Sequence, residues 1–174
     1  MKKKYLAVTI VIAIVLALTS CGTKAADEIK HTIAQMIQGN ISGEIGKTYA
    51  TQWFEFTVES IKSVDSYAGY TPNEGYALVD VLITEKGTFD DDRPTPMGTF
   101  DFYMDSDTFS DYLFPLDPID STMMPEEFDL EYGEVVTYHM VYEVPEDVSD
   151  LKLMYTEIDE ADEEGATFSI NVVL

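Results

Sequence analysis

The chain is poor in cysteine, histidine and basic residues, and each shortage excludes a class of protein. Its 174 residues include 1 cysteine, 2 histidines and 10 lysines and arginines, against 33 aspartates and glutamates. A lone cysteine cannot form a disulfide within the chain, and His31 and His139 are too few and too far apart to suggest a metalloprotease. The formal net charge of −23 repels phosphates, so we expect no nucleic-acid partner.

The N-terminal apolar stretch is too short to remain in a membrane. Residues 5–18 carry no charge, but a transmembrane helix needs about 20 apolar residues. The stretch follows three lysines at residues 2–4 and ends in Leu18-Thr19-Ser20-Cys21. A positive start, an apolar centre and small residues before a cleavage point are typical of a signal peptide.

The sequence Leu18-Thr19-Ser20-Cys21 resembles the lipobox of bacterial lipoprotein signals. This resemblance implies that residues 1–20 are removed and that Cys21 receives a diacylglycerol, whose two acyl chains suffice for stable anchoring. The alternative is an ordinary secretory leader with a cysteine nearby by chance. With Cys21 acylated, the exported domain can form no disulfide, so its hydrophobic core must stabilise it alone, as a chain of this length allows.

After Cys21 the sequence predicts a tether and then one domain. Ile29, Ile33, Met36 and Ile37 recur on one helical face, and Gly39-Asn40 then supplies a stop signal. We therefore predict a lipidated N-terminus and tether over residues 21–43, which includes a short amphipathic helix, followed by a domain over residues 44–174.

From about residue 45 apolar residues alternate with polar ones, which is typical of half-buried strands. The alternation is clearest at residues 54–58 and 77–83, and further strands are predicted at residues 99–104, 112–116, 134–144, 151–156 and 167–173. Tyr138, Met140 and Tyr142 share one strand face, which favours packing in the core over a ligand platform. Seven to eight short strands predict an all-β fold, an antiparallel β-sandwich.

Several short segments occur in a characteristic order after residue 44. They are Ile45-Gly46-Lys47-Thr48 before Phe54-Glu55-Phe56-Thr57-Val58, Gly75-Tyr76-Ala77-Leu78-Val79-Asp80-Val81, Tyr132-Gly133-Glu134, and Val144-Pro145-Glu146-Asp147 before Leu151-Lys152-Leu153-Met154-Tyr155. In this order they resemble the immunoglobulin-like lipoprotein domain called domain of unknown function 4352, which is related in fold to a small secreted mycobacterial antigen. The resemblance implies an exported bacterial β-sandwich, often Gram-positive, without established catalytic residues. The sequence departs from the family at Glu85, where asparagine is usual.

No catalytic motif is complete. Gly46-Lys47-Thr48 is similar to the end of a phosphate-binding loop, but Ile41 stands where that loop needs glycine. The chain has no Gly-x-Ser-x-Gly nucleophile motif. A hydrolase that uses two carboxyl groups stays open as an alternative, because carboxylates are abundant and the sequence does not identify a pair. We expect no catalytic residues and no enzymatic activity.

Asp105, Asp107 and Asp111 are the candidate metal ligands, and calcium is the candidate cofactor. Their spacing resembles positions 1, 3 and 7 of a calcium-binding loop, but Phe109 and Ser110 stand where an EF-hand needs an oxygen ligand and glycine. Extracellular modules bind calcium with dissociation constants of about 10⁻⁴ to 10⁻³ M, so a loose loop could suffice. The alternative is a solvated acidic run.

The sequence favours a membrane-anchored, non-enzymatic binding or accessory module on the extracytoplasmic face of the cell membrane, at a Gram-positive cell surface. Its expected partners are the membrane, through the lipid, and a cationic or protein surface, because the chain is strongly acidic. A calcium-binding or calcium-stabilised surface domain is the second interpretation, and the hydrolase is the third.

Overall fold

In the computed structural model of the chain, residues 39–89, 94–158 and 164–173 are described. They form the strands β1 (Gly39–Gly43), β2 (Thr48–Ala50), β3 (Phe54–Val64), β4 (Tyr76–Gly87), β5 (Thr95–Gly98), β6 (Phe102–Asp105), β7 (Glu127–Leu130), β8 (Val135–Pro145), β9 (Lys152–Ile158) and β10 (Glu164–Asn171), and the 3-10 turn η1 (Thr99–Asp101). The predicted all-β class is confirmed. No helix within these ranges is long and apolar enough to cross a membrane. The predicted signal peptide, Cys21 and the predicted amphipathic helix lie outside these ranges.

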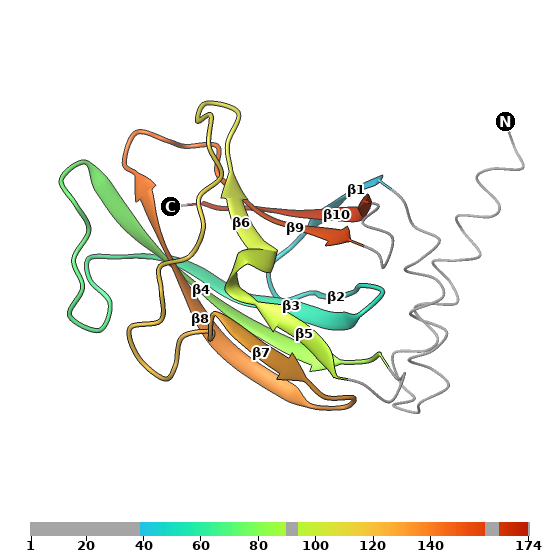
Figure 1. Cartoon of the computed structure of the whole chain (residues 1–174). Coiled ribbons are helices and arrows are strands. Elements are labelled where there is room, and N and C mark those ends of the chain that lie inside the picture. Colours follow the sequence, from blue (N-terminus) through green and yellow to red (C-terminus); the bar gives the residue numbers. More distant parts are fainter. Residues whose placement is uncertain (1–38, 90–93, 159–163, 174) are drawn as a thin grey trace, which may run out of the picture.

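Two four-stranded sheets form the layers of a β-sandwich (Figure 1). One has the strand order β1-β10-β9-β6 and the other β2-β3-β4-β8, while β5 and β7 pair separately. All these strand pairs are antiparallel except β1 with β10. The predicted sandwich is therefore confirmed, with one parallel pair at the edge of one sheet.

Aromatic rings from both sheets meet in the core. The ring centroid of Phe56 on β3 lies 5.4 Å from those of Phe102 on β6 and Phe168 on β10. Phe54 on β3 and Tyr155 on β9 have centroids 5.3 Å apart. Because each Å² of apolar surface removed from water contributes about 25 cal/mol, these contacts stabilise the pairing of the two layers.

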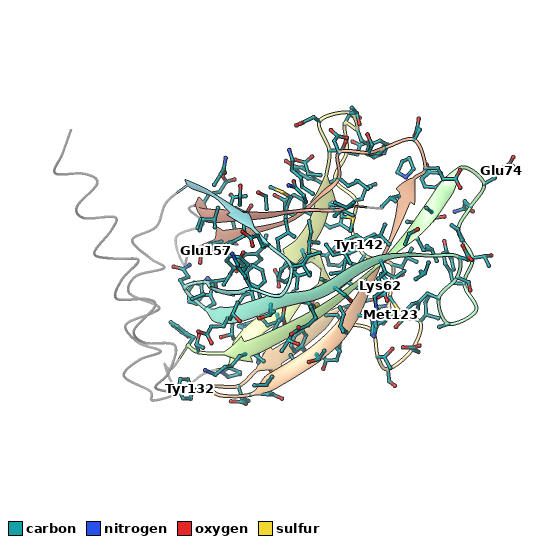
Figure 2. All side chains as sticks on the ribbon, turned by 180° about the vertical axis from the view of Figure 1, so that it is seen from behind. Lys62, Glu74, Met123, Tyr132, Tyr142 and Glu157 are labelled. Atoms are coloured by element: carbon teal, nitrogen blue, oxygen red, sulfur yellow. The ribbon has the colours of Figure 1, made fainter. Side chains whose placement is uncertain are left out.

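The clearest alternation in the sequence corresponds to the central strands β3, β4 and β8. Val79, Val81 and Ile83 on β4 are fully buried, as predicted. Met140 and Tyr142 on β8 are also fully buried, which confirms that this face packs in the core. Figure 2 shows Tyr142 between the two layers. Its hydroxyl donates a hydrogen bond to the carbonyl oxygen of Phe102 at 3.3 Å, so the buried polar atom has a partner.

The predicted tether is wrong at its C-terminal end. Residues 39–43 form β1, which pairs in parallel with β10 from Gly39 opposite Ala166 to Gly43 opposite Ile170. Ile41 packs against the core, and a Cβ on Gly43 would lie 2.6 Å from the Ile170 side chain. The predicted helix stop at Gly39-Asn40 instead begins this strand, and Gly43 allows the chain to approach β10 closely. The domain therefore includes residues 39–43, which were predicted to belong to the tether.

Two further strand predictions are only partly correct. Within residues 99–104, the first three residues form η1 and β6 begins at Phe102. Residues 112–116 form no named strand, but Leu113 makes an isolated bridge with Met104. The amide of each donates to the carbonyl of the other, at 2.8 and 2.9 Å. The short strands β2, β5 and β7 were not predicted, because three or four residues are too few for a periodic pattern.

Candidate functional site

The three predicted calcium ligands do not form a cage. Asp105 ends β6 and accepts a hydrogen bond from the Ser106 amide at 2.8 Å. Asp107 lies 3.5 Å from the ammonium group of Lys152, and its side chain is 82% exposed. In the described part of the chain, no three His, Cys, Asp or Glu side chains are placed to hold a metal ion together. The structure therefore does not bring Asp105, Asp107 and Asp111 together.

Asp150, which the sequence analysis did not single out, organises this loop instead. Its Oδ1 accepts hydrogen bonds from the hydroxyls of Ser106 at 2.6 Å and Thr108 at 3.0 Å, and its Oδ2 accepts from the Asp107 amide at 2.9 Å. These hydrogen bonds lower the pKa of Asp150, with the Ser106 hydroxyl as the main cause. The loop is thus held by hydrogen bonds to a single carboxylate.

Four aromatic side chains gather beside this loop, and we call them the aromatic surface: Phe100, Tyr103, Tyr112 and Phe114. The ring centroids are 4.7 Å apart for Tyr103 and Tyr112, and 5.5 Å apart for Phe100 and Phe114. Tyr103 and Phe114 are 6.3 Å apart, so contacts link all four rings. Phe100 and Tyr112 are each 59% exposed and Phe114 is 44% exposed. Clustered exposed aromatic side chains of this kind are typical of interaction sites.

The fold explains why these rings face outward. β6 is the edge strand of its sheet, and its buried residues Phe102 and Met104 alternate with Tyr103. The bridge from Leu113 to Met104 holds residues 112–114 beside this edge. Residues 100–114 contain four aspartates and no lysine or arginine. The aromatic surface therefore lies in a segment with strongly negative charge.

A second feature is the buried carboxyl group of Glu85 on β4. Glu85 is 1% exposed and points to the same side of the strand as Val81 and Ile83. Within the described part of the chain, neither of its carboxyl oxygens has a hydrogen-bond partner. Burial raises its pKa to about 8, with a further contribution from the charge of Asp101, so Glu85 is protonated at pH 7.

Next to Glu85 is a pocket of about 400 Å³, which we call the intersheet pocket. The described residues that line it are Trp53, Phe54, Phe89, Pro94, Thr95, Pro96, Met97, Asp101, Tyr155, Thr156 and Ile158. Thr95 is 7% exposed, and its buried hydroxyl has no hydrogen-bond partner among residues 39–89, 94–158 and 164–173. This volume falls within the range of small-molecule sites, about 300–1,000 Å³.

Three carboxyl groups surround the pocket wall at Tyr155. Burial raises the pKa of Tyr155 well above its usual value, and the charges of Asp101, Glu157 and Glu85 raise it further. Asp101 is exposed and accepts a hydrogen bond from the Gly98 amide at 2.8 Å. The surrounding protein partly removes water from the carboxyl group of Asp101 and so raises its pKa, although the hydrogen bond from the Gly98 amide opposes this shift. The electrostatic environment of the pocket is therefore negative.

Glu157 connects the strands at this end of the sandwich (Figure 2). It is 2% exposed, and it accepts hydrogen bonds from the amides of Gln52 at 2.7 Å and Ala166 at 3.1 Å. Burial raises its pKa, and the two amide bonds oppose this effect. The indole nitrogen of Trp53 donates to the carbonyl oxygen of the neighbouring Ile158 at 3.1 Å, which positions Trp53 in the pocket wall.

One histidine–aspartate pair lies elsewhere on the sandwich. Nδ1 of His139 on β8 is 2.7 Å from Oδ1 of Asp80 on β4. The nearby hydroxyl of Thr122 is hydrogen bonded to the Tyr67 hydroxyl at 2.8 Å and to Asp120 at 2.6 Å. Since this hydroxyl is bonded to Tyr67 and Asp120, the arrangement does not provide a nucleophile paired with His139.

Sequence reasoning missed the intersheet pocket, although one signal pointed to it. Continuing the alternation of Val81 and Ile83 by one step places Glu85 on the buried face. An acidic residue at a core position requires a structural or functional reason. The contribution of Asp101 and Tyr155 depends on contacts between distant strands, which a local pattern does not reveal.

Comparisons with known proteins agree with this fold. No family model matches the chain, and no curated protein matches it. Among solved structures, YjhA of Bacillus subtilis is 16% identical with a TM-score of 0.54, and the match covers 74% of this chain and 98% of YjhA. A candidate lipoprotein, YcdA of the same species, is 16% identical with a TM-score of 0.53, and the match covers 71% of this chain but only 38% of YcdA.

The secreted protein MPT63 of Mycobacterium tuberculosis is 12% identical to the chain with a TM-score of 0.51, and the match covers 75% of this chain and 97% of MPT63. This likeness confirms the expected relation in fold to a secreted mycobacterial protein. Because no family model matches, the resemblance to domain of unknown function 4352 stays a prediction. At these identities the likenesses show that the chain shares a β-sandwich fold with these bacterial proteins.

Proposed function

We propose that the protein is a lipid-anchored, extracytoplasmic binding module that engages basic protein surfaces through the aromatic surface. The lipobox at Leu18-Thr19-Ser20-Cys21 supports the anchor. The fold shared with a candidate lipoprotein and a secreted protein is compatible with this location. The observation that carries the proposed function is the cluster of Phe100, Tyr103, Tyr112 and Phe114 in an acidic segment.

The chemistry of the cluster favours lysine and arginine side chains. A cation over an aromatic ring gains about 0.5–1 kcal/mol at an exposed site and about 2 kcal/mol where it is desolvated. The acidic chain attracts basic partners over longer distances and raises their association rate at low salt. Together, the rings provide contact area and the aspartates provide charge complementarity.

The two alternative functions have less support. A calcium-stabilised domain needs a cage of oxygen ligands, and none is formed by the described His, Cys, Asp and Glu side chains. A hydrolase needs two carboxyl groups that reach one substrate. Of Glu85 and Asp101, only Asp101 lines the intersheet pocket, and Glu85 is 1% exposed.

Binding can be tested with a defined cationic probe. The mature protein is titrated with a hexa-arginine peptide, and a hexa-glutamate peptide serves as the opposite-charge control. The double variant Tyr112→Ser/Phe114→Ser should weaken hexa-arginine binding about tenfold, because two ring contacts are lost. Tyr76→Ser removes another exposed aromatic residue, 38% exposed at the start of β4, and should leave binding unchanged. Equal affinities of the wild type and the double variant for hexa-arginine would exclude the aromatic surface as the binding site.

Anchoring is tested separately in cells. Cys21→Ala should prevent incorporation of radiolabelled fatty acid, because the sulfur atom accepts the lipid. The protein should then accumulate as an uncleaved precursor or appear free of diacylglycerol. Continued labelling of the variant would contradict lipidation at Cys21 and leave an ordinary secretory leader as the better interpretation.

A further inference from the structure

The intersheet pocket has the composition of a small-molecule site and is separate from the aromatic surface. The rings of Trp53, Phe54, Phe89 and Tyr155 line it, together with the carboxyl group of Asp101. Trp53 and Phe89 pack edge to face with centroids 4.9 Å apart. Trp53 is further fixed by its hydrogen bond to Ile158. The wall is therefore preorganised, which reduces the entropy lost on binding a ligand.

Two polar groups at this end of the sandwich have no hydrogen-bond partner among the described residues. The hydroxyl of Thr95, a lining residue that is 7% exposed, is buried and unpaired. Behind the wall, both carboxyl oxygens of Glu85 are also unpaired. A buried polar group without a partner destabilises the folded protein, and such a group in a pocket wall indicates a place where a bound molecule supplies the partner. A polar ligand would provide the partner for Thr95.

The charges around the pocket determine the sign of that ligand. The negative charges of Asp101 and Glu157 act on Tyr155, and Glu85 adds a further negative charge once it ionises. The described lining residues include no lysine, arginine or histidine. Aromatic faces next to a carboxylate bind ammonium groups, since the ring quadrupole and the negative charge both attract a cation.

We propose that the intersheet pocket binds a small organic cation, an alkylammonium compound, with the charged nitrogen against the aromatic rings and Asp101. Thr95 supplies a hydrogen bond to a polar substituent of the ligand. Glu85 supplies a second negative charge behind the wall when it ionises. This site uses other aromatic rings than the proposed peptide-binding surface, namely Trp53, Phe54, Phe89 and Tyr155 instead of Phe100, Tyr103, Tyr112 and Phe114.

Ligand binding should release a proton. Without a ligand, Glu85 is protonated at pH 7, because burial and the charge of Asp101 hold its pKa at about 8. The groups that face it are the carboxyl of Asp101 and the phenol of Tyr155, while its strand neighbours Phe56 and Val136 are apolar. A cation in the pocket favours the ionised form of Glu85, so binding should be tighter at pH 8 than at pH 6.

The chain carries its own reporter for this site. Trp53 is its single tryptophan, so intrinsic fluorescence reports on the pocket wall. The mature protein is titrated with choline chloride, with 3,3-dimethylbutan-1-ol as an uncharged compound of the same shape, and with sodium chloride at matched ionic strength. We expect a saturable fluorescence change with choline, and affinity at least about tenfold weaker for the uncharged compound.

Matched variants distinguish the loss of the negative charge of Asp101 from a loss of folding. Asp101→Asn should weaken choline binding about tenfold, while Asp65→Asn, an exposed residue just after the end of β3 that is farther from Phe54, should leave it unchanged. Circular dichroism checks that both variants fold. Glu85→Gln should abolish proton release, measured as the difference in titration heat between buffers of different ionisation enthalpy, and the tightening from pH 6 to pH 8.

Several outcomes would overturn the inference. Equal affinity for choline and its uncharged counterpart would make the pocket an apolar cavity without preference for cations. A response reproduced by sodium chloride would indicate screening of the acidic surface rather than a site. Choline binding that survives Asp101→Asn undiminished would place the cation elsewhere. None of these results bears on hexa-arginine binding at the aromatic surface.

Discussion

The side chain of Glu157 fills the space next to Gly165, where β9 and β10 meet. A Cβ built on Gly165 would lie 3.0 Å from Oε2 of Glu157 and 3.1 Å from its Cβ. The same Oε2 accepts the hydrogen bond from the Ala166 amide. The register of β9 and β10 shifts between Glu164 and Thr167, so Gly165 lies at an irregularity of the ladder. The missing side chain leaves room for a buried carboxylate that joins the two sheets.

This relationship predicts a coupled mutational effect. Gly165→Ala should lower the free energy of unfolding by about 1–2 kcal/mol, because hydrogen bonds hold Glu157 and limit its movement. Glu157→Ala should cost more, about 2–5 kcal/mol, since the amides of Gln52 and Ala166 lose their acceptors. The double variant should be more stable than the sum of the two effects implies. Urea unfolding of all four proteins measures the coupling, and simple additivity would contradict the shared space.

Glu85 predicts a pH-dependent stability. Its pKa is about 8 in the folded protein and 4.5 in an unperturbed chain. Between these values the unfolded state loses the proton and the folded state keeps it, so stability falls as the pH rises from about 4.5 to 8. Glu85→Gln removes this contribution and should gain stability relative to the wild type by about 1.4 kcal/mol per pH unit in that window. Glu59→Gln, at an exposed site, should follow the wild type in urea unfolding series.

Calcium should stabilise the protein no more than magnesium does. Asp105, Asp107 and Asp111 do not form a cage, so divalent cations act only by screening the acidic surface. Thermal melts in calcium, magnesium and sodium chloride at matched ionic strength should show similar shifts, with or without Asp105→Asn and Asp107→Asn. A shift specific to calcium that either substitution removes would restore the loop as a metal site.

The conformation of the loop after β6 should depend on the carboxylate of Asp150, which is distant in the sequence. Asp150→Ala removes the acceptor for the Ser106 and Thr108 hydroxyls and the Asp107 amide. We expect faster hydrogen exchange at the Asp107 amide, with little change in the core strands. Because its pKa is lowered in the fold, protonation of Asp150 at acid pH should have the same effect. Asp147→Ala, at an exposed position nearby, is the control, and equal exchange in both variants would exclude the role of Asp150.

The alternation of apolar and polar residues correctly predicted the strands that have one face in the core and one face toward solvent. β3, β4 and β8 are long enough for the alternation to appear, and Val79, Val81 and Ile83 are buried as expected. β1 was not predicted, because two glycines in Gly39–Gly43 conceal its pattern and its parallel pairing with β10 spans most of the chain. Local periodicity contains no information on which distant strand will provide a partner.

The candidate sites were harder to predict, because each depends on contacts across the fold. Tyr112 and Phe114 were placed on a strand, but only the bridge from Leu113 to Met104 brings them beside Tyr103. Asp150 is more than forty residues from the loop that it organises. The acidic spacing of Asp105 and Asp107 suggested metal ligands, whereas the hydrogen-bond donors in that loop turn toward Asp150.

The position of β1 in the sequence limits how far a lipid-anchored domain can lie from the membrane. If the lipid is on Cys21, as proposed, roughly 18 residues separate the bilayer surface from Gly39, and fully extended they span at most about 60 Å. Tension on the domain would enter through the hydrogen bonds between β1 and β10, because β1 is the first described strand and lies at a sheet edge. The parallel pair at this edge would then be the mechanical link between the membrane and the sandwich.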